Sequence, residues 1–129
     1  MTDLNDALRA ATSGMQAQAA RLRLVSENIA NSDTPGYHRK LVSFEAEMGR
    51  DAAGTVAPGP VRLDSSPLER VYDPAHPLAD ADGYFEGSNV DLMIEMADAR
   101  EAGRSYEANL KLFEQVREMQ TALMDLLRR

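Results

Sequence analysis

Residues 4 to 29 read LNDALRAATSGMQAQAARLRLVSENI, and this stretch predicts a long amphipathic helix. Its seam residues recur every three or four positions, as in a heptad pattern with one polar member. They are Leu4, Leu8, Ala11, Met15, Gln18, Leu22, Val25 and Ile29. Asp3 and Asp6 suit the positive end of the helix dipole, and the Pro35-Gly36 pair stops the helix. At 1.5 Å per residue, we expect a helix of roughly 40 Å.

A second long helix is predicted in residues 88 to 129, which contain no proline. Its seam keeps the same spacing as far as Phe113 and then shifts by a three-residue step to Val116. The seam residues are Leu92, Met96, Ala99, Gly103, Tyr106, Leu110, Phe113, Val116, Met119, Leu123 and Leu126. Helices of roughly 40 and 60 Å do not fit a compact globule of this length. The predicted fold is therefore mainly α and elongated, with the two terminal helices pairing as a coiled-coil-like core.

The middle of the chain predicts a small, irregular β segment. All six prolines and six of the eight glycines lie between residues 35 and 87. Strand-like stretches at residues 41–44, 61–63 and 68–72 are separated by turn signals. This segment carries most of the net charge and should face solvent, and residues 49–60 are expected to be its most mobile part.

These patterns divide the chain into three predicted segments. Residues 1–36 form an N-terminal core helix and turn, residues 37–87 form the small β-rich segment, and residues 88–129 form the C-terminal core helix. Each helix carries an apolar stripe that pairing with the other helix covers on one side at most. The pattern therefore favours a multi-helix assembly over a single helical hairpin.

Composition excludes several classes of protein. The chain has no cysteine, which excludes a disulfide framework and a thiolate nucleophile. A net charge of -7 argues against binding to nucleic acid or anionic lipid. No apolar run approaches the roughly 20 residues that span a bilayer, and the N-terminus lacks the features of a Sec-type signal. We therefore expect no nucleic-acid partner and no membrane insertion of its own.

No catalytic or cofactor site can be assembled from the sequence. His38 and His76 have no local partner for a dyad, and the serines lack a nucleophile-elbow context. Asp80, Asp82 and Gly83 match part of a calcium loop, but Leu78 and Asn89 stand where ligands belong. The aspartates are predicted to form turns, with calcium binding left to a titration. We predict no enzyme, cofactor, resident metal or small-molecule substrate.

The end of the first helix carries the most informative motif. Residues 26–37 read SENIANSDTPGY, in which amide side chains at a helix end precede a stiff turn. This stretch resembles the N-terminal signature of the bacterial flagellar axial proteins, the rod and hook subunits. The matching positions are Ser26, Glu27, Asn28, Ile29, Ala30, Asn31, Thr34, Pro35, Gly36 and Tyr37.

A second stretch narrows the resemblance to the proximal rod proteins of this family. Residues 71–84 read VYDPAHPLADADGY, and the pairs Asn89-Val90 and Glu95-Met96 and the run from Tyr106 to Asn109 follow. The motif positions are Tyr72, Asp73, Pro74, His76, Pro77, Asp80, Gly83, Tyr84, Asn89 and Val90. The resemblance covers nearly the whole chain. It departs at Ser88, where the family usually has proline, and it is poor over residues 49–60.

The resemblance implies a structural role. Terminal helices of the family, here with Asn109 among the interface residues, pack with copies and with other rod proteins in a helical tube. That tube is the periplasmic rod, which joins motor to hook and encloses the export channel. The resemblance also implies export through the flagellar type III apparatus without a cleaved Sec-type signal, and contacts with basal-body components.

Two expectations and one alternative accompany this interpretation. The free chain is expected to be largely disordered at both ends until assembly supplies the missing apolar surface. The turn from Asn28 to Tyr37 is expected to set how the helical core joins the β segment. The alternative is a coiled-coil adaptor or export chaperone that never polymerises, since paired heptad helices serve many partners.

Overall fold

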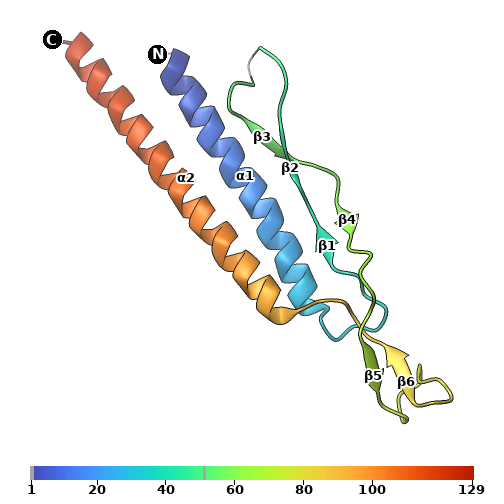
Figure 1. Ribbon diagram of the computed structural model, residues 1–129. Helices are drawn as coiled ribbons and strands as arrows, with labels where there is room; N and C mark the ends of the chain where they lie inside the picture. The colour runs from blue at the N-terminus through green and yellow to red at the C-terminus, as the bar shows by residue number, and fades with distance from the viewer. Residues whose placement is uncertain (1, 51) are drawn as a thin grey trace.

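The fold is an elongated pair of antiparallel helices with short β ladders at one side and one end (Figure 1). A computed structural model describes residues 2–50 and 52–129. Helix α1 (Thr2–Ala30) has 29 residues and helix α2 (Leu92–Leu127) has 36. The Asp91 carboxylate caps α2 by accepting a hydrogen bond from the Met93 N–H at 3.0 Å. The prediction of a mainly α fold with two paired terminal helices is confirmed.

In residues 2–50 and 52–129, six short strands form three antiparallel two-stranded ladders. Strand β1 (Lys40–Leu41) pairs with β4 (Arg62–Leu63), and β2 (Phe44–Ala46) pairs with β3 (Val56–Pro58). Strand β5 (Arg70–Tyr72) pairs with β6 (Tyr84–Glu86). The β2–β3 ladder lies along α1, which separates it from α2, whereas the β5–β6 hairpin projects at the end away from the chain termini (Figure 1).

The strands agree only partly with the sequence prediction. Each predicted stretch contains strand residues, but β3 and β6 were not predicted. Strand β3 lies within residues 49–60, where Thr55 is buried and the Val56 N–H donates to the Ser13 Oγ at 3.1 Å. This bond attaches β3 to a helix far away in sequence, and the mobility of residues 49–60 stays a prediction. Asp51, in the same segment, lies outside the described residues.

The two helices approach closely because small side chains lie between them. Ala17 and Ala102 have no exposed area and Ala11 is 1% exposed. Gly14 faces Asn109 so closely that a Cβ at Gly14 would lie 2.8 Å from the Asn109 Nδ2. Asn109, expected at an interface, therefore packs within the helix pair.

Most of the predicted seam of α2 is exposed in the single chain, although Val116, one of its members, is buried. The buried residues of α2 are Glu95, Ala102 and Val116, while seven of the predicted seam residues are exposed. The exposed seven are Leu92, Met96, Tyr106, Leu110, Met119, Leu123 and Leu126. On α1, Ala11 and Val25 are buried, Leu4, Leu8, Met15, Gln18 and Leu22 are half-buried, and Ile29 is exposed. Close packing selects small and paired polar side chains, so most of the large apolar ones of α2 remain exposed.

Two helical glycines provide a test of this close approach. A Cβ at Gly103 would meet nothing within 4 Å, so Gly103→Ala should raise the free energy of unfolding by about 0.8 kcal/mol through helix propensity. Gly14→Ala should gain clearly less, because Asn109 must move and give up its hydrogen bond to the Ser105 carbonyl. Urea denaturation of both variants, in sucrose to favour the folded helices of the free chain, measures the difference. Equal gains would show that the Gly14–Asn109 contact is not a constraint.

Candidate functional site

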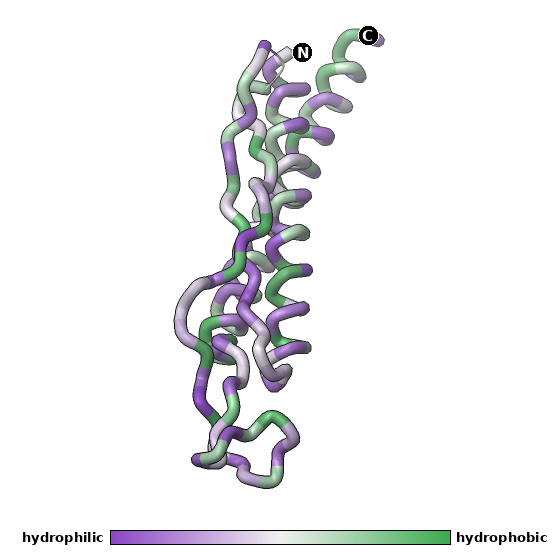
Figure 2. The backbone as a smooth tube through the Cα atoms, turned by 90° about the vertical axis from the view of Figure 1, so that its right-hand side faces the viewer, coloured by the Kyte–Doolittle hydropathy of each residue, from purple (hydrophilic) through white to green (hydrophobic). Residues whose placement is uncertain are grey.

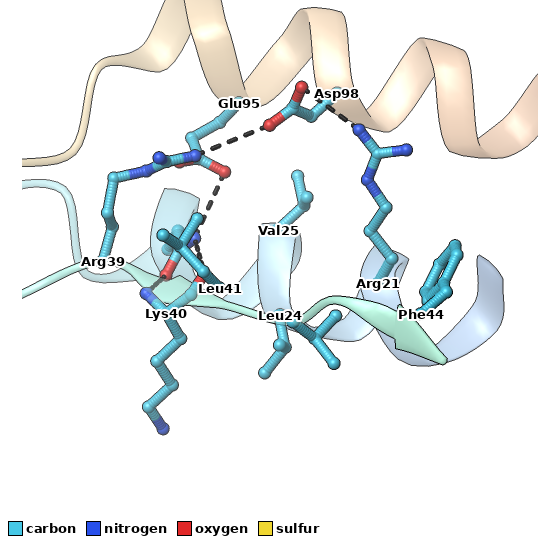
Figure 3. A pocket seen from close by; sticks show the side chains of 11 residues that line it. Arg21, Leu24, Val25, Arg39, Lys40, Leu41, Phe44, Glu95 and Asp98 are labelled. Carbon is cyan, nitrogen blue, oxygen red and sulfur yellow. Dashed lines mark hydrogen bonds and ion pairs between the residues drawn. The ribbon is translucent and has the colours of Figure 1, made fainter. Parts of the chain in front are cut away.

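A group of buried and half-buried polar side chains joins the end of α1, the following turn and the start of α2. We call this group the polar clasp, and it consists of Asn28, Tyr37, Arg39, Asp64, Asn89 and Glu95. Figure 3 shows the Arg39 and Glu95 side chains pointing toward one another over the β1 segment. The clasp also borders a cleft of about 250 Å³ between α1, β1 and α2.

Asn28 lies at the centre of the clasp and is 1% exposed. Its Oδ1 accepts hydrogen bonds from the Tyr37 hydroxyl and the Lys40 N–H, both at 2.8 Å. Its Nδ2 donates to the Lys40 carbonyl at 3.0 Å and to the Glu95 Oε2 at 3.2 Å. The amide thus pairs with the Lys40 backbone as a neighbouring strand would, and it fixes β1 to the end of α1.

Glu95 is fully buried and binds Arg39. Its Oε1 accepts from the Arg39 Nε at 2.7 Å. Arg39 also reaches Asp64 at 3.3 Å and Asp98 at 3.5 Å. Burial lowers the pKa of Arg39, but hydrogen bonding and charge from Glu95 and Asp64 outweigh it, so the pKa lies above its ordinary value. The guanidinium therefore stays charged and links α2 to the loop that follows β4.

Asn89 completes the clasp in front of α2. Its Oδ1 accepts from the Arg39 N–H at 2.6 Å, and its Nδ2 donates to the Asp64 carbonyl at 3.0 Å and the Ser66 carbonyl at 3.1 Å. Two hydrogen bonds from Ser66 are the main causes that lower the pKa of Asp64. Burial is the main cause that raises the pKa of Tyr37. Three stretches distant in sequence therefore meet at one point.

The remaining signature residues shape the turn after α1. The Asn31 Nδ2 donates to the Glu27 carbonyl at 2.8 Å, and its Oδ1 accepts from the Thr34 hydroxyl at 3.1 Å. Gly36 has φ +76°, and its N–H donates to the Gly87 carbonyl at 3.0 Å. The carboxylate of Glu27 pairs with Lys40 at 3.0 Å. Pro35 is half-buried, whereas Ser26, Ile29 and Ala30 are exposed.

The second motif is divided between two places. Asn89 lies in the clasp with half-buried Val90 beside it, whereas Tyr72, Asp73, Pro74, His76, Pro77, Asp80, Gly83 and Tyr84 belong to the β5–β6 hairpin. In the hairpin, the Asp80 Oδ1 accepts from the N–H groups of Asp82 at 2.9 Å and Tyr84 at 3.0 Å. The bond from Tyr84 is the main cause that lowers the pKa of Asp80.

Asp73 and Asp80 of the hairpin act as turn formers, as predicted. The Asp73 Oδ1 also accepts a backbone hydrogen bond, from the Ala75 N–H at 3.2 Å, and Gly83 supplies φ +87°. The His76 ring stacks on Phe85 with centroids 3.9 Å apart. Across residues 2–50 and 52–129, no group of three acidic, histidine or cysteine side chains is placed to hold a metal ion.

Arg39, Asp64 and Asp98 were not among the predicted site residues. One local feature could have pointed to Arg39: the pair Arg39-Lys40 is one of two adjacent basic pairs in the chain, and it lies close after the signature. Its partners could not be identified, because Asp64 and Glu95 lie 25 and 56 positions farther along the chain.

Both terminal parts of the chain, which contain the clasp residues Asn28, Tyr37, Asn89 and Glu95, match models of flagellar rod proteins. The family model described as "Flagella basal body rod protein" matches residues 8–38, and the one described as "Flagellar basal body rod FlgEFG protein C-terminal" matches residues 81–126. The chain is 42% identical to the flagellar basal-body rod protein FlgC of Agrobacterium fabrum, over 99% of this chain and 98% of that protein. The chain belongs to the FlgC family of flagellar basal-body rod proteins.

Other FlgC proteins are similar over most of their length. Identity is 36% to FlgC of Salmonella typhimurium, over 90% of this chain and 92% of the relative. Identity is 35% to FlgC of Bacillus subtilis, over 80% of this chain and 84% of the relative. The FlgC family consists of structural rod proteins rather than enzymes. No helix in the described part of this chain is long and apolar enough to cross a membrane.

Proposed function

We propose that the chain polymerises through its two terminal helices into the helical periplasmic rod of the flagellum. In this role it transmits torque from motor to hook and encloses the export channel. Its partners are copies of itself, other rod proteins and basal-body components. The flagellar type III apparatus exports it without a cleaved Sec-type signal. Membership of the FlgC family supports this proposal over a non-polymerising adaptor or chaperone.

The exposed stripe of α2 is the observation that carries the proposal. Leu92, Met96, Met119, Leu123 and Leu126 are each 42–64% exposed in the single chain. Full burial of such a side chain is worth about 1.5 to 3 kcal/mol, and extended apolar surfaces mark protein contacts. Neighbouring subunits would cover this stripe and offset the cost of ordering two long helices.

The three segments then have separate tasks. We propose that residues 1–36 and 88–129 build the core of the rod and that residues 37–87 lie outside it. The signature from Ser26 to Tyr37 sets the angle between them, since Asn28 holds β1 against α1 and Gly36 contacts the segment after β6. We therefore expect the polar clasp to hold the core helices and the β segment in one fixed arrangement during assembly.

Substitution of the stripe tests the proposed function. We expect the combination Met96→Gln, Met119→Gln and Leu123→Gln to leave the far-ultraviolet circular dichroism of the purified chain unchanged, because all three residues are exposed. In cells that lack the native gene, this variant should form no rods and no motile cells. The matched control replaces Arg104, Glu107 and Glu118, also exposed on α2, by glutamine and should keep motility. Normal rods with the stripe variant would contradict the proposal.

A further inference from the structure

The C-terminal end of α2 is an exposed apolar projection that carries Asp125 and is followed by two arginines. Leu126 and Leu127 are 64% and 83% exposed, and Arg128 and Arg129 follow them. Figure 2 shows this as a green stretch with a purple tip at the C-terminus. The Gln120 Nε2 donates to the Asn5 Oδ1 at 2.9 Å, so in this antiparallel pair about one turn of α2 extends beyond Thr2, the first described residue of α1.

The opposite end of the helical core holds an acidic cleft of about 510 Å³. Its acidic residues are Asp33, Glu69 and Asp91, and its apolar residues are Pro67, Val90 and Leu92. The described residues that line it include no Lys or Arg. Within residues 2–50 and 52–129, Asp33 and Glu69 form no ion pair. The cleft lies where α2 begins, at the end of the core away from both termini (Figure 1).

We propose that the C-terminal turn of a second copy of this chain docks in this cleft. Leu126 and Leu127 of one copy contact Pro67, Val90 and Leu92 of the next, and Arg128 and Arg129 face Asp33 and Glu69. The negative end of one α2 dipole then meets the positive end of the next. The inference rests on the proposed function and specifies one of its contacts.

The positions of the two surfaces fit a polymer. A contact between two different surfaces on opposite ends of a subunit is heterologous, and it continues from copy to copy unless rotation closes a ring. Opposite charge on the two surfaces favours this register over tail-to-tail and cleft-to-cleft encounters, which place like charges together.

Charge reversal in the full-length chain tests the contact. The tail variant carries Arg128→Glu and Arg129→Glu, and the cleft variant carries Asp33→Arg and Glu69→Arg. Asp91 is left unchanged because it caps α2. By sedimentation velocity at low salt, wild type should self-associate, and each variant alone should associate at least about tenfold more weakly, a difference of ~1.4 kcal/mol. An equimolar mixture of the two variants should associate again, because each tail then meets a cleft of opposite charge.

Cysteine pairing supplies a second readout, since the chain has no cysteine of its own. Chains with Leu127→Cys and chains with Ser66→Cys, which lies at the cleft, should form a disulfide-linked dimer on mild oxidation. Gln16→Cys, on the exposed side of α1, replaces Ser66→Cys as the control and should not cross-link.

Several outcomes would overturn the contact. They are a wild-type chain that stays monomeric at the highest attainable concentration, a tail variant that associates like wild type, and a mixture that does not recover. Motile cells with either charge-reversed variant would also overturn it, while leaving the proposed rod function intact. Failure of the stripe experiment would instead count against the rod function itself.

Discussion

Glu95→Ala should lower the free energy of unfolding by about 3 kcal/mol, because it removes one partner from a buried ion pair. Arg39 would lose its 2.7 Å contact, and the Nδ2 of Asn28, a residue that is 1% exposed, would lose an acceptor. We expect this large loss from one residue of a 36-residue helix because Glu95 contacts both Arg39, which follows the turn, and Asn28 on α1. Urea denaturation followed by circular dichroism measures it.

Two variants separate this effect from a general loss of charge on α2. Glu95→Gln keeps the size of the side chain and its acceptor oxygen, so it should cost less than Glu95→Ala. Glu101→Ala removes a carboxylate with 69% exposure that contacts Arg21 at 3.4 Å, and exposed pairs contribute about 0 to 1 kcal/mol. Equal losses for Glu95→Ala and Glu101→Ala would show that the clasp does not hold the helix ends together.

The two helices were predictable because their signals are local. A three- and four-residue apolar period, an early acidic turn and the Pro35-Gly36 stop all lie within one stretch of chain. The aspartate turns of the hairpin were predictable for the same reason, since Asp80 bonds to backbone groups two and four residues away.

The packing face of α2 was not predictable from the same period. Hydrophobicity alone places Leu92, Met96 and Leu110 inside, but the α1 contact uses Ala102, Glu95 and the Gly14–Asn109 approach. A small residue gives a weak hydrophobic signal, and a buried glutamate gives a misleading one unless its partner is known. The apolar period of α2 therefore describes a surface that this single chain leaves open.

The clasp and β3 depend on pairings across large sequence separations. Asn28 meets Glu95 67 positions away, and Ser13 meets Val56 43 positions away. The resemblance marked Asn28, Asn89 and Glu95 as motif residues, but no local pattern shows that they touch. Composition alone predicted that residues 49–60 are mobile. It could not show that the Ser13 hydroxyl on α1 accepts a hydrogen bond from the Val56 N–H.

Asn28→Asp should destabilise the chain by about 4 kcal/mol at pH 7 with almost no change in side-chain size. The substitution exchanges the Nδ2 donor for an acceptor, so the bonds to the Lys40 carbonyl and Glu95 are lost, at about 1 to 3 kcal/mol for each group left unsatisfied. It also sets a carboxylate against the Glu95 Oε2, which lies 3.2 Å from the atom that it replaces.

The pH dependence of this variant should identify the cause. A like charge raises the pKa of the introduced carboxyl in the folded state above its unfolded value of about 3.9. Protonation therefore favours the folded state, so the penalty is full at neutral pH and is relieved as pH falls through the raised folded pKa. Asn28→Ala loses these two bonds and also the two that Oδ1 accepts, but it adds no charge, so its deficit relative to wild type should not shrink in this way. If the deficits of Asn28→Asp and Asn28→Ala change in parallel from pH 7 to about pH 4, repulsion from Glu95 is not the cause.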